Sequence, residues 1–572
     1  MVMPIEIADM SDKEMPARLA IESQYARLSE AVQNKDLDAL CALHTSEYKE
    51  FQITGEERDL GEVMGEWRGE FAAMIEPRLH TEIRGLDLDG DEASVTVCSV
   101  QSFISSPVAS RRFSNRIETI RRDYWINSGV GWRLRRSERQ AIRSWVDDKL
   151  DAETRFEPLL TAKQRAAVVR DLRVRVFPFK SVLAGNGFDD LTGLDRLIGD
   201  ARIVALGEAT HGTAEFFQMK HRLLEYLVEK KGFTVFAVEG NWPETQVADR
   251  FIKTGEGDAG AALAAMYFWT WQTEEVTALL HWMRHYNATR GERPVLSFAG
   301  FDMQVPNVAV KHVINFLDRS SSADRGAVPT LYDRMEKLEK WGSEVPAVEN
   351  TRLADRARKM LDLIEAQREM LVMASTPEEY RDVRQAARIV LQTFERRAGI
   401  LERDRAMAEN VCWLIEEALP GQKIVVWAHS SHVGTEMGGS EKSLGNHLRD
   451  RYGDQMVVIG FSTHHGVVRA RRREEGRAQP GPLVAAPLAP ARKVSVEAVF
   501  QETGLPRFIL NLRYLPKDSA VNAWLSKPRL HRMIGAVYDP DQDSKYYAHL
   551  RLPEMYDGIV FIAESTAAKP LK

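Results

Sequence analysis

Short apolar runs alternate with longer amphipathic stretches over most of the chain after residue 165. The runs lie at 202–206, 234–239, 295–302, 423–429, 456–464, 507–512 and 558–564. Near-continuous apolar strands separated by helices are typical of a mainly parallel sheet buried on both faces. Residues 306–420 carry only helical patterns, which predicts a large helical subdomain inserted between two strands, as a wall or lid of a site. We therefore predict one α/β domain over residues 166–572.

The first part of the chain has a different pattern. Apolar residues recur every three or four positions over 17–44, and period-two alternation follows over 92–105 and 114–140, with "NSGVG" as a hairpin turn. This order predicts an α+β domain over 1–145, followed by a helical linker over 146–165.

Two segments of this α+β domain carry a family resemblance. "YARLSEAVQNKDLDAL…LHTSEY" and the closing strand "GWRLRRSE" resemble the SnoaL-like, nuclear-transport-factor-two-like fold. The resemblance implies a cone-shaped domain, a fold that hosts enzymes, ligand pockets and dimer interfaces alike. Because no pair of residues here is a good candidate for acid/base catalysis, we expect an accessory role, either gating substrate or forming a homodimer. His44 and His80 are interpreted as surface or packing residues.

Composition and charge exclude several classes of partner. The chain is 44% hydrophobic and 28% charged with a net charge of −6, so no overall basic field favours nucleic acid. Its three cysteines, Cys41, Cys98 and Cys412, lie far apart, which argues against a disulfide framework. The N-terminus lacks the pattern of a signal peptide, and no apolar run approaches the ~20 residues of a membrane span. We expect a cytoplasmic protein that needs no cofactor and binds no membrane.

Carboxylates and histidines follow the apolar runs of the α/β half. Ligands of open parallel sheets bind outside the carboxyl ends of the strands, so residues at these ends are expected to form one site. The residues, in chain order, are Glu208 and His211, Glu239, Asp302, His429 and His432, and His464 and His465.

The sequence also lacks the motifs of several mechanisms. No G-x-S-x-G is present, and no dinucleotide-binding or P-loop motif follows a strand. No cysteine lies in the loops concerned. Carboxylates and imidazoles suit the activation of water, either by general base catalysis or through a metal ion.

Other polar and aromatic residues have more than one interpretation. His281 and His285 are spaced as metal ligands can be, but a pair on a helix surface is the preferred interpretation. Asp302 is interpreted as a capping or histidine-orienting residue that borders the substrate. Trp242, Trp269 and Trp271 could form an apolar wall for a substrate, and core packing is an equal alternative.

Residues from about 165 onward resemble the erythromycin esterase-like family. The matching segments include "DARIVALGEATHGTAEFFQMKHRLLEYL", "FAVEGNWPE", "RDRAMAENVCWLI", "VVWAHSSHVG" and "RLHRMIGAVYDP". The resemblance implies hydrolysis of an ester, such as a macrolide lactone, without a covalent intermediate, and so a link to antibiotic resistance or secondary metabolism.

The same resemblance implies roles for individual residues. His211 matches the general base, Glu208 and Glu239 match the orienting carboxylates, and His429 and His432 match a second histidine pair. Lys220 stands where the family's resistance enzymes have Arg, which leaves its expected contact with substrate open. Two alternatives stay open: a metal-dependent hydrolase with another substrate, and a non-catalytic ligand-binding protein.

Overall fold

The structure is a computed structural model of the 572-residue chain. It describes residues 14–53, 56–108, 111–155, 159–320, 332, 335, 347–436, 441–473 and 480–571. The chain divides into two compact units, with the boundary between Arg165 and Ala166. Each unit has its own sheet.

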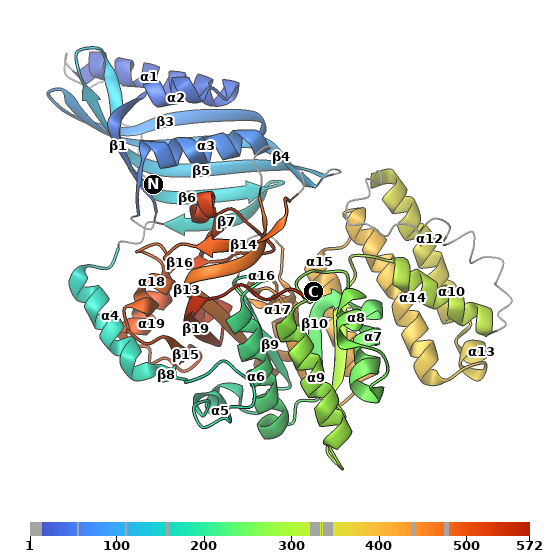
Figure 1. Cartoon of the computed structure of the whole chain (residues 1–572). Helices are drawn as coiled ribbons and strands as arrows, with labels where there is room; N and C mark the ends of the chain where they lie inside the picture. The colour runs from blue at the N-terminus through green and yellow to red at the C-terminus, as the bar shows by residue number, and fades with distance from the viewer. Residues whose placement is uncertain are drawn as a thin grey trace. The chain divides into compact units, whose positions relative to one another are not determined.

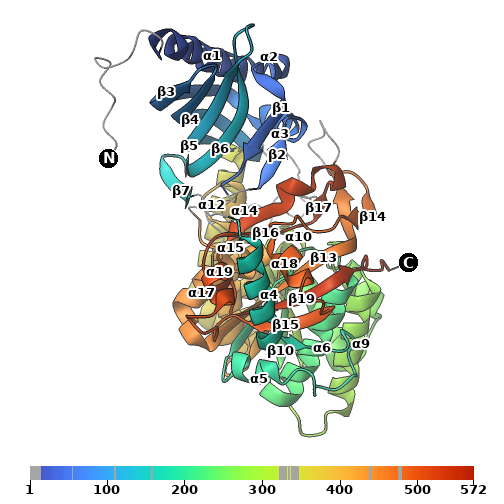
Figure 2. The same cartoon turned by 90° about the vertical axis from the view of Figure 1, so that its left-hand side faces the viewer.

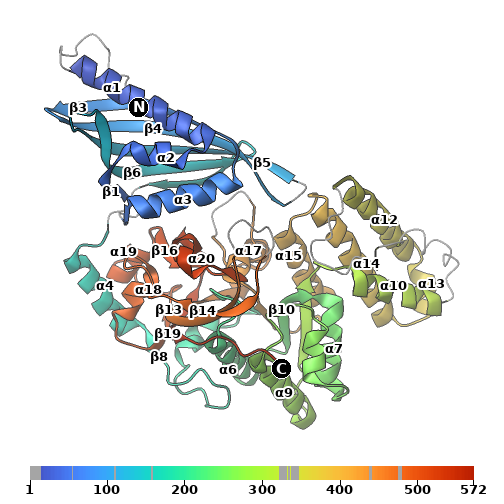
Figure 3. The ribbon, with the colours of Figure 1, turned by 45° about the horizontal axis from the view of Figure 1, so that its top comes forward.

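The first unit is a seven-stranded sheet covered by three helices. The sheet has the order β2-β1-β6-β5-β4-β3, with β7 beside β6, and only β1 and β6 pair in parallel. Helices α1, α2 and α3 lie against it (Figure 3), and their apolar side chains share a core with Val95, Val97 and Trp125. The elements are α1 (Glu14–Asn34), α2 (Leu37–Ala42), β1 (His44–Phe51), β2 (Glu57–Asp59), α3 (Leu60–Ala73), β3 (Ile75–Asp89), β4 (Glu92–Val108), β5 (Arg111–Asn127), β6 (Trp132–Val146) and β7 (Lys149–Arg155).

The structure corrects the expected helical linker over 146–165. Residues Lys149–Arg155 form β7, which pairs antiparallel with β6, and the helix α4 begins only at Ala162 and ends at Arg175. Asp147 and Asp148 both have positive φ, 49° and 62°. This is the conformation of a two-residue hairpin turn, so the chain reverses and pairs instead of continuing as a helix.

The second unit is built on a ten-stranded sheet of order β11-β10-β12-β9-β13-β19-β15-β8, with β14 and β17 beside β13. Strands β11, β10, β12, β9, β13 and β19 are parallel to one another, whereas β15 runs antiparallel to β19, and β8 in turn runs antiparallel to β15. All seven strands that the apolar runs predict are present. The strands are β8 (Phe177–Pro178), β9 (Ile203–Leu206), β10 (Val235–Asn241), β11 (Ser297–Asp302), β12 (Ile424–Trp427), β13 (Met456–Arg472), β14 (Leu483–Leu488), β15 (Arg507–Asn511), β17 (Val537–Tyr538) and β19 (Gly558–Ser565), and β16 (Arg529–Arg532) pairs separately with β18 (Tyr547–Leu550).

Helices follow most of the strands (Figure 1): α7 begins directly after β10, whereas the loop 207–213 separates β9 from α6. Helices α6 and α9 lie side by side along the sheet (Figure 2). The helices are α5 (Gly193–Ile198), α6 (Ala214–Lys231), α7 (Trp242–Thr254), α8 (Ala259–Ala264), α9 (Glu274–Thr289), α10 (Asn307–Arg319), α12 (Ala347–Ala366), α13 (Arg368–Met373), α14 (Pro377–Arg397), α15 (Arg403–Trp413), α16 (Ser430–Val433), α17 (Leu444–Tyr452), α18 (Val496–Gln501), α19 (Ala520–Leu525) and α20 (Leu552–Met555), and Leu414–Ala418 extends α15 as a π-helix.

The described part of residues 306–420 is helical and contains no strand, as the sequence predicts. Helices α10, α12 and α13 all pack against α14, and they form the yellow group of helices in Figure 1. The last helix of this insertion, α15, contacts β11 and so reaches the sheet.

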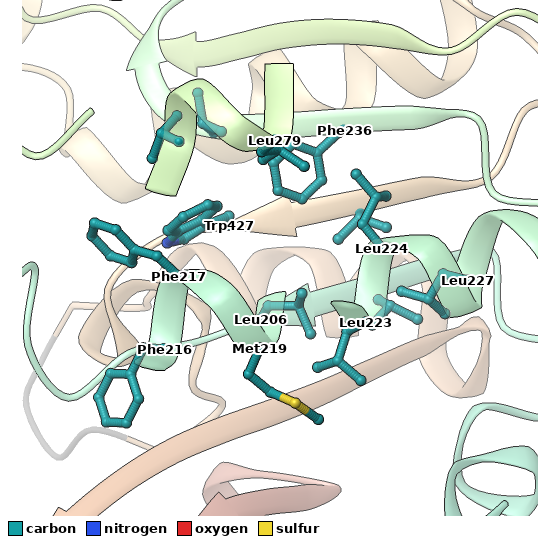
Figure 4. Packing of buried hydrophobic residues seen from close by; sticks show 14 of the residues in the cluster. Leu206, Phe216, Phe217, Met219, Leu223, Leu224, Leu227, Phe236, Leu279 and Trp427 are labelled. Carbon is teal, nitrogen blue, oxygen red and sulfur yellow. The ribbon is translucent and has the colours of Figure 1, made fainter. Parts of the chain in front are cut away.

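Apolar side chains hold helix α6 against the sheet. Phe217, Leu224 and their neighbours on α6 pack over Leu206 of β9, Phe236 of β10 and Trp427 of β12 (Figure 4). Burial of each such side chain contributes roughly 1.5–3 kcal/mol, so the strands are fixed along their whole length. Because β9 and β12 contain only four residues each, the chain passes from this core to polar residues within one or two positions.

No helix in the described ranges is both long enough and apolar enough to cross a membrane.

Candidate active site

The ends of three adjacent parallel strands bring Glu208, Glu239 and His429 to one level. Trp427 of β12 pairs with Leu206 of β9 on one side and with Val238 of β10 on the other. These three paired residues lie at the same height in the sheet. Glu239 comes one residue after Val238, Glu208 two residues after Leu206, and His429 two residues after Trp427. Strand register alone accounts for their meeting at one edge of the sheet.

Glu208 is a buried carboxylate with three donors. Its Oε1 atom lies 2.7 Å from Nδ1 of His211, and its Oε2 atom accepts from Nζ of Lys220 at 2.7 Å and from Nε1 of Trp427 at 2.6 Å. Burial raises the pKa of Glu208, but the charge of Lys220 and the bond to His211 outweigh burial and lower it below the usual value. The carboxylate is ionised and fixed at both oxygens.

Glu208 also decides the tautomer of His211. An ionised carboxylate can only accept, so Nδ1 of His211 carries the proton and Nε2 carries the lone pair in the neutral ring. No residue of the described ranges bonds to Nε2, and the side chain is 15% exposed. His211 thus offers an unshared basic nitrogen at the edge of the sheet.

Lys220 lies beneath Glu208, away from the exposed side of the site. Its side chain is completely buried, and Nζ lies 4.4 Å from the ring centroid of Trp427. Burial lowers the pKa of Lys220 to about 8, against the opposing effect of Glu208. The structure therefore corrects the expected contact with substrate: Lys220 fixes Glu208 and is covered by the core.

Glu239 is held by a backbone and by a guanidinium. Its Oε2 atom accepts from the backbone N–H of His429 at 3.0 Å, and its Oε1 atom accepts from Nη2 of Arg403 at 2.7 Å. Burial raises the pKa of Glu239, but the charges of His432 and Arg403 bring it well below the usual range. Glu239 is a permanent negative charge between the histidines.

Both ring nitrogens of His429 are bonded to neighbouring protein groups. Its Nδ1 atom accepts from the backbone N–H of Ser431 at 3.2 Å, and its Nε2 atom donates to the carbonyl of Ile534 at 3.2 Å. Burial, with the nearby His211 and His432, lowers its pKa to about 3. His429 is a neutral residue that positions its neighbours, and its ring lies 5.0 Å from that of His211.

His432, unlike His429, is surrounded by groups that favour its protonated form. Its Nδ1 atom lies 2.8 Å from Oδ1 of Asp404, and its Nε2 atom lies 3.5 Å from Oε1 of Glu239 and 3.1 Å from Nη1 of Arg403. Burial lowers the pKa of His432, but Glu239 and Asp404 outweigh burial and raise it above the usual value. When neutral, Nε2 accepts from Arg403, and when protonated it faces Glu239.

Arg403 and Asp404 are site residues that the sequence reasoning missed. They begin α15, in a segment expected to be a wall or lid, and nothing in its helical pattern singles them out. Their only signal is the family-like segment "RDRAMAENVCWLI".

Asp302 is occupied by Arg403 and has no exposed surface. Its Oδ1 atom accepts from Nε of Arg403 at 3.2 Å and its Oδ2 atom from Nη2 at 2.6 Å, and Gln304 also donates to it. The structure thus corrects the expectation that Asp302 borders the substrate. Asp302 orients Arg403, not a histidine.

The remaining expected substrate contacts separate into buried and half-buried residues. Trp242 packs edge-on against Trp413, and Trp271 packs edge-on against Trp427, so both belong to the core. Trp269 is half-buried. His464 bonds to the ring of His465, and no described hydrogen bond or ring contact joins it to the cluster of Glu208, Glu239 and the three histidines. His281 and His285 are exposed on α9, as interpreted from sequence.

No three or more His, Cys, Asp or Glu residues in the described ranges are grouped as metal ligands. The carboxylate oxygens of the site instead face Lys220 and Arg403, which supply the positive charge that a metal would bring.

The fold and this geometry define a class: an α/β protein whose sheet edge holds two histidine–carboxylate pairs around a buried glutamate. The chain belongs to the erythromycin esterase family, whose model, described as erythromycin esterase, matches residues 228–565. The family suggests ester hydrolase activity. Glu208 and His211 precede the matched range, whereas Glu239, Asp302, Arg403, His429 and His432 lie within it.

Individual relatives agree with this assignment. The chain is 24% identical over 430 residues to erythromycin esterase type II of Escherichia coli, covering 68% of this chain and 96% of the relative. A crystal structure of a Bacillus cereus protein superposes with a TM-score of 0.63 at 26% identity, covering 71% of this chain and 99% of that one. A mutant of erythromycin esterase EreC in its open conformation has a TM-score of 0.54 at 18% identity, covering 68% and 96%. The described residues in the range of the family model lie within the second unit, and the SnoaL-like resemblance of the first unit stays a prediction.

Proposed function

We propose that this chain hydrolyses an ester or lactone by direct attack of a water molecule that His211 deprotonates. The observation that carries the proposal is the pairing of a fixed Nδ1, bonded to ionised Glu208, with an Nε2 lone pair that no donor of the described residues contacts. A positioned base of this kind contributes ~10²–10⁴-fold to a rate.

The proposed reaction needs one base and one acid. The proton of water passes to Nε2 of His211 as the water oxygen bonds to the carbonyl carbon, which gives a tetrahedral anion. The C–O bond to the alcohol then breaks, and protonated His432 gives its Nε2 proton to the leaving alkoxide. Solvent returns the protons, and the net change is addition of one water. The raised pKa of His432 supports it as the acid, whereas the pKa of about 3 at His429 does not.

A serine nucleophile is the mechanistic alternative. Oγ of Ser431 lies 2.7 Å from Nδ1 of His429, which is the spacing of a nucleophile and its base. A base with a pKa of about 3 is too weak to deprotonate a hydroxyl near neutral pH, so direct attack by water is favoured.

The substrate is proposed by class. We propose a macrolide-like lactone or another secondary-metabolite ester, and the half-buried Trp269 supports an apolar wall for it. The first unit is proposed to be accessory, as a gate or a homodimer interface. Its most buried carboxylate among the described residues, Asp123, is engaged by Tyr25, Arg121 and Ser137.

The test is a hydrolysis screen read by mass spectrometry. Wild-type, His211→Gln and Ser431→Ala proteins are incubated with macrolides, simple lactones and aryl esters. Gain of one water with wild type and Ser431→Ala, but not with His211→Gln, supports the proposal. Loss of activity in Ser431→Ala, with an acyl adduct on the wild-type protein, would replace water attack by covalent catalysis. Wild type without activity on every ester would overturn the proposed function.

A further inference from the structure

Arg403 retains hydrogen-bonding capacity after its protein partners are counted. A guanidinium has five N–H groups. Nε bonds Asp302, both Nη2 protons are used by Asp302 and Glu239, and one Nη1 proton faces Nε2 of neutral His432. One Nη1 proton therefore has no acceptor among the described residues, and a second is released when His432 is protonated.

Asp302 decides where that edge of the guanidinium points. Its two carboxylate oxygens accept from Nε and Nη2 in a bidentate ion pair. This pair fixes the plane of the guanidinium and leaves Nη1 on the side of His432. The side chain of Arg403 is 18% exposed, like that of His432, while Asp302 is completely buried. The free N–H thus belongs to a partly exposed side chain and lies on the side of partly exposed His432.

The other buried cation cannot take this position. Lys220 has no exposed surface and bonds Glu208 from the core side. Arg403, in contrast, contacts both Glu239 and the acid His432. Burial lowers the pKa of Arg403, but the carboxylates of Asp302 and Glu239 outweigh burial and raise it, so Arg403 stays charged.

We propose that Arg403 is a catalytic residue, whose free Nη1–H donates to the oxyanion of the tetrahedral intermediate during ester hydrolysis. This inference rests on the proposed function. While His432 still holds its proton, Nη1 has two N–H groups for the oxyanion, and it regains a protein acceptor when His432 has protonated the alcohol. Donors preorganised for a developing oxyanion are worth about 10²–10³-fold in kcat.

The experiment compares Arg403→Lys and Arg403→Ala with wild type on the ester that the wild-type protein hydrolyses. Arg405→Ala is the matched control, because Arg405 lies on the same helix with its side chain 61% exposed. We expect kcat to fall about 10²–10³-fold in both Arg403 variants, with KM little changed, and guanidinium ion to restore part of the activity of Arg403→Ala. The phosphonate monoester that mimics the tetrahedral state should lose affinity in the same proportion.

A second measurement uses the wild-type protein and so does not depend on folding of a variant. Bound phosphonate should protect Arg403, but not Arg405, from modification by phenylglyoxal, as mapped by peptide mass. Normal kcat in Arg403→Lys, or modification of Arg403 unaffected by phosphonate, would overturn the inference while leaving esterase activity intact. A wild-type protein that hydrolyses no ester would instead overturn the proposed function.

Discussion

Nδ1 of His432 lies 2.8 Å from Oδ1 of Asp404, the same kind of pairing that joins His211 to Glu208 at 2.7 Å. Both imidazoles are oriented through Nδ1 by a carboxylate; Nε2 of His211 has no partner among the described residues, while Nε2 of His432 faces Arg403 and Glu239. Their surroundings differ: His432 has a raised pKa and lies near Glu239, while His429 beside them is neutral. Two imidazoles oriented by carboxylates, of which His432 has the raised pKa, suit one base and one acid.

Replacement of His211 tests the base. His211→Gln should lower hydrolysis by ~10²–10⁴-fold, because the amide can still bond Glu208 but cannot accept the proton of water. The measurement is kcat/KM together with a thermal unfolding curve. His285→Gln, an exposed change on α9, is the control and should be neutral. Near-normal turnover in His211→Gln would refute the assignment.

Replacement of Asp404 tests the acid through pH. The carboxylate raises the pKa of His432, so Asp404→Asn should lower that pKa. An acid must be protonated to act, so activity declines as the pH rises through the pKa of His432. The alkaline limb of the pH–rate profile should therefore move to lower pH in Asp404→Asn. An unmoved limb would assign the acid to another group.

The pH dependence of stability follows from the same shift. Because the pKa of folded His432 is above its unfolded value of about 6.5, its contribution is fully present below that value and is lost as the pH rises through the folded pKa. Asp404→Asn should reduce this loss, which thermal unfolding at a series of pH values would measure.

Lys220 is expected to act through Glu208. Lys220→Met removes the cation from a fully buried ion pair, which typically costs about 3–5 kcal/mol of unfolding free energy. It should also raise the pKa of Glu208 and loosen the tautomer of His211, lowering kcat. Denaturant unfolding and kinetics measure both effects, and Lys230→Met, at an exposed position of the same helix, should change neither. Full stability in Lys220→Met would contradict the buried pairing.

Gly212 allows the loop that carries His211 to approach β13. An added Cβ would lie 2.0 Å from the carbonyl oxygen of Arg469, which is backbone and cannot move aside alone. Gly212→Ala should lower the unfolding free energy by about 1–3 kcal/mol and displace His211, with loss of activity. Gly535→Ala, where an added Cβ meets nothing within 4 Å, should be tolerated. Equal unfolding curves for the two variants would contradict this packing.

Removal of metal ions should leave hydrolysis unchanged. The carboxylates that could bind a metal already face Lys220 and Arg403. Activity is measured after exhaustive treatment with EDTA and elemental analysis, with a known zinc hydrolase as the positive control for removal. Loss of activity that added Zn²⁺ or Mn²⁺ restores would favour the metal-dependent alternative.

Local sequence patterns predicted much of the fold. Each apolar run of the second unit became a strand, because near-continuous hydrophobicity fits a strand covered on both faces. The prediction of a helical linker was wrong at Asp147 and Asp148, because their polar sequence fits both a helix and a hairpin turn.

The sequence by itself determined that carboxylates and histidines follow adjacent strands, and strand register then brought Glu208, Glu239 and His429 together. Only the tertiary structure decided that Lys220 is covered, that His429 is neutral and that Arg403 and Asp404 enter the site. Burial and pKa depend on what packs around a side chain, and these partners come from distant segments of the chain: Glu239 and Arg403 are 164 residues apart, and Glu208 and Trp427 are 219 apart. The local pattern of apolar and polar residues does not predict contacts between residues so far apart in the sequence.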